Sequence, residues 1–370
     1  MRKDKKVIIS EIPNDIPSDV EISVRNLSVG FMSHGKRLNV IRNVSVDIKK
    51  GETFAIVGES GSGKSVFTKT FTGMLEANGF ISSGNIYFQG EDLASFKNNK
   101  QWLHIRGKKI ATIFQDPMTS LNPLLRIGNQ LMEVLTLHRG MSKKEAKAEA
   151  IELLRRVKIP NPEQRFKDYP FMYSGGMRQR VVIAIALACN PDVLICDEPT
   201  TALDVTVQTQ ILDLIKELQR EYNYTTIFIT HDLGVVAGVA DRVAVMYGGQ
   251  IVEYGTVEDV FYTPAHPYTW ALLSSLPQLA VDGEDLKYIH GNPPSFIGDI
   301  QGDAFAPRNE YAMKIDFVKE PPMFKVSDTH YAKTWLLDPR APKVEPPKVV
   351  RELSKKIAST KVDSNLKGGN

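Results

Sequence analysis

The chain has few cysteines, no long apolar run and almost no net charge, and each absence excludes a class of protein. Its 370 residues include two cysteines, Cys189 and Cys196, which lack metal-ligand spacing and lie in apolar surroundings. We therefore expect two buried thiols in a reducing cytosol and no disulfide framework. The longest apolar run, Val181–Cys189, is about half of a membrane span. A net charge of +3 does not by itself indicate nucleic-acid binding.

Composition is that of an ordinary globular protein, and it changes along the chain. Hydrophobic residues make up 42 % and charged residues 24 %. The N-terminal residues do not have the pattern of a signal peptide. We expect a flexible tail at 1–19, one large domain at 20–275, an irregular proline-rich extension at 276–342 and a lysine-rich disordered tail at 343–370.

A phosphate-binding loop stands between an apolar β-type run at 53–57 and a helix predicted at 66–75. The loop fits G-x-x-x-x-G-K-[ST] and comprises Gly58, Glu59, Ser60, Gly61, Ser62, Gly63, Lys64 and Ser65. Its glycines let backbone N–H groups approach a nucleotide's phosphates. We expect Lys64 to reach the β- and γ-phosphates and Ser65 to ligate Mg²⁺. A chance Gly/Ser-rich turn is the alternative, and the flanking strand and helix argue against it.

Two carboxylates, Asp197 and Glu198, end a second apolar run at 193–196. Paired acids after a strand are commonly a solvated turn. With a phosphate loop in the same chain, we expect Asp197 to hold the Mg²⁺ shell and Glu198 to polarise an attacking water.

A second Gly-rich turn comprises Ser174, Gly175 and Gly176 and precedes a helix predicted at 181–189. A helix N-terminus favours an anion, so this is a second candidate phosphate site. A plain N-cap at Ser174 is the alternative.

Secondary-structure patterns favour an α/β fold. Short β-type runs between 20 and 48 predict an antiparallel layer, and a helical pattern dominates from about 124 to 157. Strands at 193–196, 225–230 and 243–246 alternate with helices at 207–222 and 233–240. This alternation predicts a mostly parallel sheet covered on both faces.

Together these motifs resemble an ATP-binding-cassette (ABC) ATPase over about residues 20–262. The resemblance implies a P-loop NTPase (RecA-like) core, an N-terminal antiparallel β-subdomain and an inserted helical subdomain at about 117–180. It also implies ATP and Mg²⁺ as ligands and places Ser174, Gly175 and Gly176 in the signature loop that contacts nucleotide held by another subunit.

Four further residues receive roles from this resemblance alone. Gln115 is similar to the glutamine that senses Mg²⁺ and the transport partner, and His231 to the switch histidine that reaches the γ-phosphate. Asp204 ends Thr201-Ala202-Leu203-Asp204, which resembles the loop that crosses the dimer interface. Phe31 is either an adenine-stacking aromatic or a core residue.

The C-terminal part resembles the extension of D-type ATPases in oligopeptide/dipeptide permeases. The resemblance rests on His266-Pro267-Tyr268, Gly291-Asn292-Pro293-Pro294, Phe305-Ala306-Pro307-Arg308 and the segment 326–337. Many relatives have four cysteines there, suited to an iron–sulfur cluster. This chain has Asp303, Asn309, Asp316 and Thr334 at those positions. Oxygen-bearing side chains do not replace thiolates around a cluster, so we expect none.

The resemblance implies the ATPase of an oligopeptide importer, peripheral on the cytoplasmic face of the cell membrane. Its expected partners are a second ABC ATPase, two transmembrane permease subunits and, indirectly, an extracellular peptide-binding protein, with no nucleic acid. Alternative cargoes are dipeptides, nickel or another small solute. Two other classes stay open: a soluble ABC ATPase acting on nucleic acid or ribosomes, and a nucleotide-dependent regulatory module without useful turnover.

Overall fold

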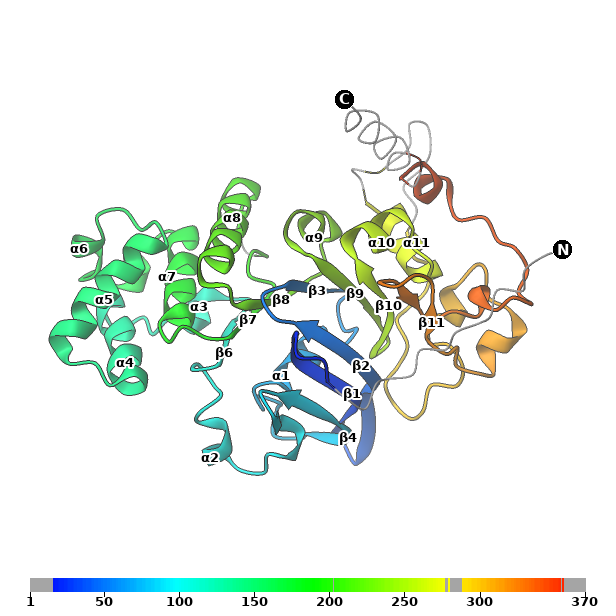
Figure 1. Cartoon of the computed structure of the whole chain (residues 1–370), viewed down its shortest axis with the longest axis horizontal. Helices are drawn as coiled ribbons and strands as arrows, with labels where there is room; N and C mark the ends of the chain where they lie inside the picture. The colour runs from blue at the N-terminus through cyan, green and yellow to red at the C-terminus, as the bar shows by residue number, and fades with distance from the viewer. Residues whose placement is uncertain (1–15, 202, 277–278, 280–287, 354, 356–370) are drawn as a thin grey trace.

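Two sheets and a group of helices make up the computed structural model (Figure 1). The structure describes residues 16–201, 203–276, 279, 288–353 and 355. The expected tail at 1–19 therefore lies mostly outside the described residues. No helix in the described ranges is both long enough and apolar enough to cross a bilayer.

The central sheet has the order β11-β12-β10-β9-β3-β8-β7-β6. Its strands are β3 (Thr53–Val57), β6 (Ile110–Ile113), β7 (Val193–Asp197), β8 (Thr225–Thr230), β9 (Arg242–Tyr247), β10 (Gln250–Thr256), β11 (Phe324–Lys325) and β12 (Tyr331–Ala332). The five strands from β9 to β6 are parallel, and every residue of β3 and β8 is buried. Burial on both faces explains why these strands read as continuous apolar runs rather than alternating ones.

The second sheet is antiparallel, with the order β2-β1-β4-β5, and confirms the expected N-terminal layer. It consists of β1 (Val20–Ser33), β2 (Lys36–Lys49), β4 (Gly79–Phe88) and β5 (Glu91–Asp92). The short runs expected there form two long strands instead. His34 and Gly35 join them with positive φ angles of 47° and 74°. A two-residue turn of this kind matches the twist of paired strands, so it closes a hairpin.

Helices cover the sheet and form a separate layer. They are α1 (Lys64–Lys69), α2 (Asn99–Trp102), α3 (Pro117–Ser120), α4 (Ile127–Arg139), α5 (Lys143–Arg156), α6 (Pro162–Arg165), α7 (Gly175–Leu187), α8 (Val205–Tyr222), α9 (Leu233–Val239), α10 (Val257–Tyr262) and α11 (Pro267–Ser274), with 3₁₀ turns η1 (Leu93–Ser95), η2 (Pro170–Met172), η4 (Ala306–Arg308), η5 (Lys314–Phe317) and η6 (Trp335–Leu337). Helices α3 to α7 lie together on the left of Figure 1. They correspond to the inserted helical subdomain expected at about 117–180.

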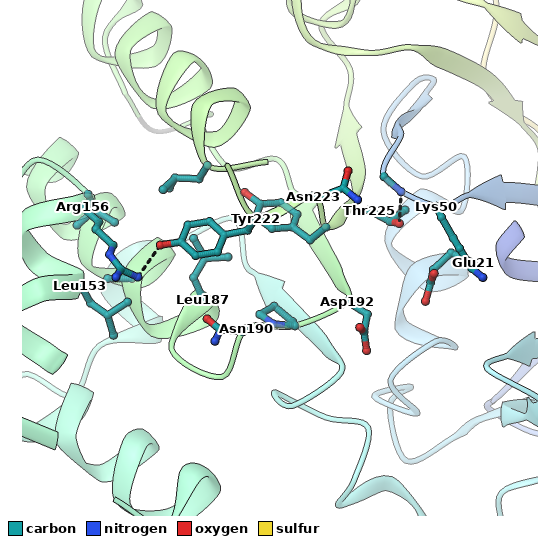
Figure 2. Close-up of a pocket in the computed structure, with 16 residues that line it drawn as sticks. Glu21, Lys50, Leu153, Arg156, Leu187, Asn190, Asp192, Tyr222, Asn223 and Thr225 are labelled. Carbon is teal, nitrogen blue, oxygen red and sulfur yellow. Dashed lines mark hydrogen bonds between the residues drawn. The ribbon is translucent and has the colours of Figure 1, made fainter. Parts of the chain in front are cut away.

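A cavity of about 260 Å³ lies where this helical layer meets the sheet (Figure 2). Arg156 at the end of α5 donates a hydrogen bond to the Tyr222 hydroxyl at the end of α8, across the joint. Asp192 and Thr225, at the amino ends of β7 and β8, line the far side. The expected phosphate loop follows the carboxyl end of β3, so this cavity lies at the opposite end of the strands from it.

The C-terminal extension continues the central sheet instead of standing apart from it. Strand β12 pairs with β10, and β11 pairs with β12. Glu253 of β10 anchors the extension, because its carboxylate accepts a hydrogen bond from His330 Nε2 (2.7 Å). The same carboxylate also accepts hydrogen bonds from Ala265 N (2.6 Å) and His266 N (3.2 Å) in the segment before α11. Glu253 and His330 are both buried.

We expect Glu253→Ala to lower the free energy of unfolding by about 3 kcal/mol, because it leaves several buried donors without an acceptor. Urea denaturation of the full chain measures this change. Glu310→Ala is the matched control, since Glu310 lies exposed in the same extension. Equal stability of the two variants would remove Glu253 as the anchor.

Three local expectations are wrong. Cys189 is only half-buried, while Cys196 is buried as expected. Helix α1 ends at Lys69, well before the expected end at residue 75. Residues 348–353 are helical within the segment expected to be disordered, and Val350 is buried there.

Candidate active site

The phosphate loop connects β3 to α1, as its sequence predicts. Gly58 has a φ of 154°, and a Cβ there would lie 2.1 Å from the Met246 carbonyl oxygen, so a side chain is excluded. The Ser62 hydroxyl is buried without a hydrogen-bond partner among the described residues. An orphaned donor in a glycine-built loop fits an anionic ligand such as a nucleotide phosphate.

Lys64 lies buried inside this loop. Its Nζ donates to the carbonyl oxygens of Gly58 (2.8 Å) and Glu59 (2.9 Å). Burial lowers the pKa of Lys64, and the nearby charges of Glu198 and Asp197 oppose that effect. The loop and the two carboxylates therefore share one electrostatic site.

Ser65 and Asp197 meet at the base of this site. The Ser65 hydroxyl donates to Asp197 Oδ1 at 2.9 Å. Burial, with the adjacent Glu198 charge, raises the pKa of the Asp197 carboxyl, and the Ser65 hydrogen bond opposes the shift. A hydroxyl beside a carboxylate is a donor set that suits Mg²⁺.

Glu198 is the centre of the other half of the site. Gln115 Nε2 (3.1 Å) and Thr201 Oγ1 (3.0 Å) donate to its Oε2, and His231 Nδ1 lies 3.1 Å from its Oε1. These partners come from the segments after β6, β7 and β8. Glu198 itself has a φ of 48°, and its N–H donates to the Ile229 carbonyl. The backbone and three side chains thus fix the direction of this carboxylate.

The remaining expected site residues lie elsewhere in the chain. Ser174 caps α7 by accepting the Met177 N–H (3.3 Å), and Asp204 caps α8 by accepting the Val207 N–H (3.0 Å). Helix α7 belongs to the helical layer on the left of Figure 1, whereas α1 lies with the sheets. Phe31 is 9 % exposed and opposes Gly79 in the β1–β4 pair. In this structure Phe31 is part of the core.

Three contacts of the site were missed from the sequence. Thr201 lies in the segment that resembles an interface loop, yet its hydroxyl donates to Glu198. Tyr268 and Arg308 both reach Glu59 of the phosphate loop from beyond residue 262. Tyr268 and Arg308 are far from Glu59 along the chain, and no local pattern signals contacts at that separation.

Comparisons with known proteins agree with this geometry. The model of the ABC transporter family matches residues 41–201. The model of the oligopeptide/dipeptide transporter C-terminal region matches residues 252–315. Both parts of the expected architecture are therefore present in one chain.

Similar proteins cover nearly the whole chain. The oligopeptide transport ATP-binding protein AmiE of Streptococcus pneumoniae is 62 % identical over 92 % of this chain and 96 % of its own length. The oligopeptide transport ATP-binding protein OppD of Bacillus subtilis is 56 % identical over 92 % and 95 %. The dipeptide transport ATP-binding protein DppD of Lactococcus lactis is 56 % identical over 88 % and 93 %.

Two solved cassettes share the fold. One, a dimer in a post-hydrolysis state bound to ADP and phosphate, is 28 % identical with a TM-score of 0.57, over 64 % of this chain and 98 % of its own. The other, part of the cbiONQ transporter complex of Clostridium perfringens, is 29 % identical with a TM-score of 0.58, over 66 % and 91 %. This chain belongs to the ABC transporter ATPases of the oligopeptide/dipeptide transporter class.

Proposed function

We propose that the chain hydrolyses ATP to power uptake of oligopeptides across the cell membrane. The observation that carries this proposal is the combination of a cassette with the oligopeptide/dipeptide C-terminal region, together with the AmiE identity of 62 % over 92 % of the chain. We place the protein peripherally on the cytoplasmic face, paired with a second ABC ATPase and two transmembrane permease subunits. An extracellular peptide-binding protein would deliver cargo to the permeases.

In the proposed reaction, backbone N–H groups of the phosphate loop and the Lys64 ammonium bind the triphosphate. Ser65, Asp197 and Gln115 would hold Mg²⁺, which neutralises phosphate charge when bound. Glu198 takes a proton from the attacking water as a general base, with Gln115, Thr201 and His231 orienting its carboxylate. His231 is the side chain we assign to the γ-phosphate.

We assign the second wall of the nucleotide site to another subunit. Ser174, Gly175 and Gly176 lie at the exposed start of α7, where backbone N–H groups are available to an anion. Asp204 would act at the same dimer interface. ATP then stabilises the closed pair because both subunits contact it. Phe31 is buried and opposes Gly79 in the β1–β4 pair, so we favour its core role over adenine stacking.

We propose that the extension binds no iron–sulfur cluster. The four candidate positions each accept a backbone N–H from a nearby residue: Asp303 from Phe305, Asn309 from Tyr311, Asp316 from Met313 and Thr334 from Leu336. These local hydrogen bonds stabilise the turns around the four positions without a cluster. Iron and sulfide in protein purified without air would contradict this proposal.

Asp303 also gives a pH dependence to stability. Burial, reinforced by the Asp316 charge, raises its pKa from 3.8 to about 6. The folded state then holds this proton more tightly than the unfolded state, so the stabilisation present below about pH 4 is lost as pH rises through about 6. We expect Asp303→Asn, which keeps the acceptor oxygen, to flatten this decline by about 3 kcal/mol. Urea denaturation at several pH values measures it. Exposed Asp213→Asn is the control, and equal slopes in all three proteins would refute the expectation.

Affinity purification from solubilised membranes, followed by uptake assays, tests the proposed function. We expect two permease subunits and a second ATPase to accompany the chain, and loss of labelled oligopeptide uptake when its gene is deleted. Uptake of a labelled dipeptide tests the alternative cargo, which the similarity to DppD supports. Ribosomes in place of membrane subunits would refute the importer.

A further inference from the structure

The C-terminal extension makes a direct ion pair with the phosphate loop. Arg308 at the end of η4 donates from Nη1 to Glu59 Oε2 (2.6 Å) and from Nη2 to Glu59 Oε1 (3.0 Å). The two residues are 249 positions apart in the sequence. A two-pronged pair of this kind fixes direction as well as distance.

The guanidinium of Arg308 is held rigidly behind the loop. Its side chain is 4 % exposed. Its Nε donates to the His290 carbonyl (2.8 Å), and its Nη1 also donates to the Tyr247 hydroxyl (3.1 Å). These hydrogen bonds hold the buried guanidinium in one orientation, in which it can bind a single carboxylate.

Tyr268 of α11 makes a second contact with the same loop residue. Its hydroxyl accepts the Glu59 backbone N–H at 2.9 Å. Tyr268 is fully buried, and its ring packs on those of Tyr247 and Phe305. Both the side chain and the backbone of Glu59 are therefore held by segments that lie beyond the cassette strands.

The charge of Glu59 makes its pair with Arg308 important for ATP binding. Glu59 is the only acidic residue in the loop at 58–65, and in the proposed function this loop binds the triphosphate, which is a polyanion. An unpaired carboxylate there would repel the phosphates at short range. We propose that Arg308 is a positioning residue that holds and neutralises Glu59, so that the extension is part of the ATP site. This inference rests on the proposed ATPase function.

The test measures the Kd for MgATP of the purified full chain by calorimetry. We expect Arg308→Gln to raise the Kd about tenfold, because the unpaired Glu59 carboxylate then repels the phosphates. The increase in Kd should shrink at high salt, because salt screens this repulsion. In the Arg308→Gln/Glu59→Gln double variant the repelling charge is absent, so we expect the Kd to return to within about threefold of wild type. Arg340→Gln, which breaks an exposed two-pronged pair with Asp338, is the matched control.

Two outcomes would overturn the inference: an Arg308→Gln Kd equal to wild type, or an equally weak Kd in the double variant. Should Arg308→Gln fail to fold, two other variants decide. Arg308→Lys keeps the charge but loses the two-pronged geometry, so its Kd should rise by less than the roughly tenfold expected for Arg308→Gln, and adding Glu59→Gln to Arg308→Lys should not weaken binding further. A Kd raised about tenfold or more in Arg308→Lys, or raised further by the added Glu59→Gln, would refute the neutralising role. Wild-type protein that binds no MgATP would instead refute the proposed function.

Discussion

Glu198→Gln is expected to lower kcat for ATP hydrolysis by about 100-fold or more while leaving the Kd for ATP nearly unchanged. The amide has almost the shape of the carboxylate, so the contacts with Thr201 and His231 lose little geometry. It does not accept a proton from water, so the general base is lost. Phosphate release by the assembled complex measures turnover, and equilibrium binding measures the Kd.

The control for this variant is Glu258→Gln, at an exposed position at the start of α10. It removes the same charge away from the site and should leave kcat unchanged. Undiminished turnover in Glu198→Gln would show that another group activates the water, and the hydrogen bonds around Glu198 would then have only a structural role.

Lys64→Ala is expected to raise the Kd for MgATP by about 100-fold, because a charge-assisted contact to the triphosphate is lost. The variant also removes the donor that now bonds to the Gly58 and Glu59 carbonyl oxygens. The value of kcat/KM should fall with binding while kcat at saturating ATP changes much less, since Lys64 is assigned to the same phosphates in the ground state and the transition state.

Lys144→Ala is the control for Lys64→Ala, because Lys144 is exposed on α5 in the helical layer. Circular dichroism and thermal unfolding separate a binding defect from a folding defect. Unaltered ATP affinity in folded Lys64→Ala would contradict the assignment of the phosphate loop.

The core of the site was predictable because each of its parts has a local pattern. A strand, glycines, lysine and serine in fixed order define the loop, and an apolar run defines the strand before Asp197. The contact of Ser65 with Asp197 follows, since parallel strands end at one edge of a sheet. The fold class was predictable for the same reason.

Other features depend on contacts between distant segments, which a single sequence does not display. Arg308 belongs to the Phe305-Ala306-Pro307-Arg308 motif, yet nothing local in the sequence predicts its buried pair with Glu59. Phe31 fits either a core or an adenine contact, and only the packing against Gly79 separates them. Helix ends were misplaced as well, since α1 stops at Lys69 although its pattern continues.

The central claim is that one ATP lies between the phosphate loop of this chain and a signature loop of another subunit. The most direct measurement is specific crosslinking in Glu198→Gln protein, purified with its companion subunits in detergent, from Ser174→Cys to the partner's phosphate loop, with and without MgATP. The account predicts that MgATP increases the closed nucleotide-domain pair and the crosslink together. Separated domains and no crosslink at saturating MgATP would contradict it.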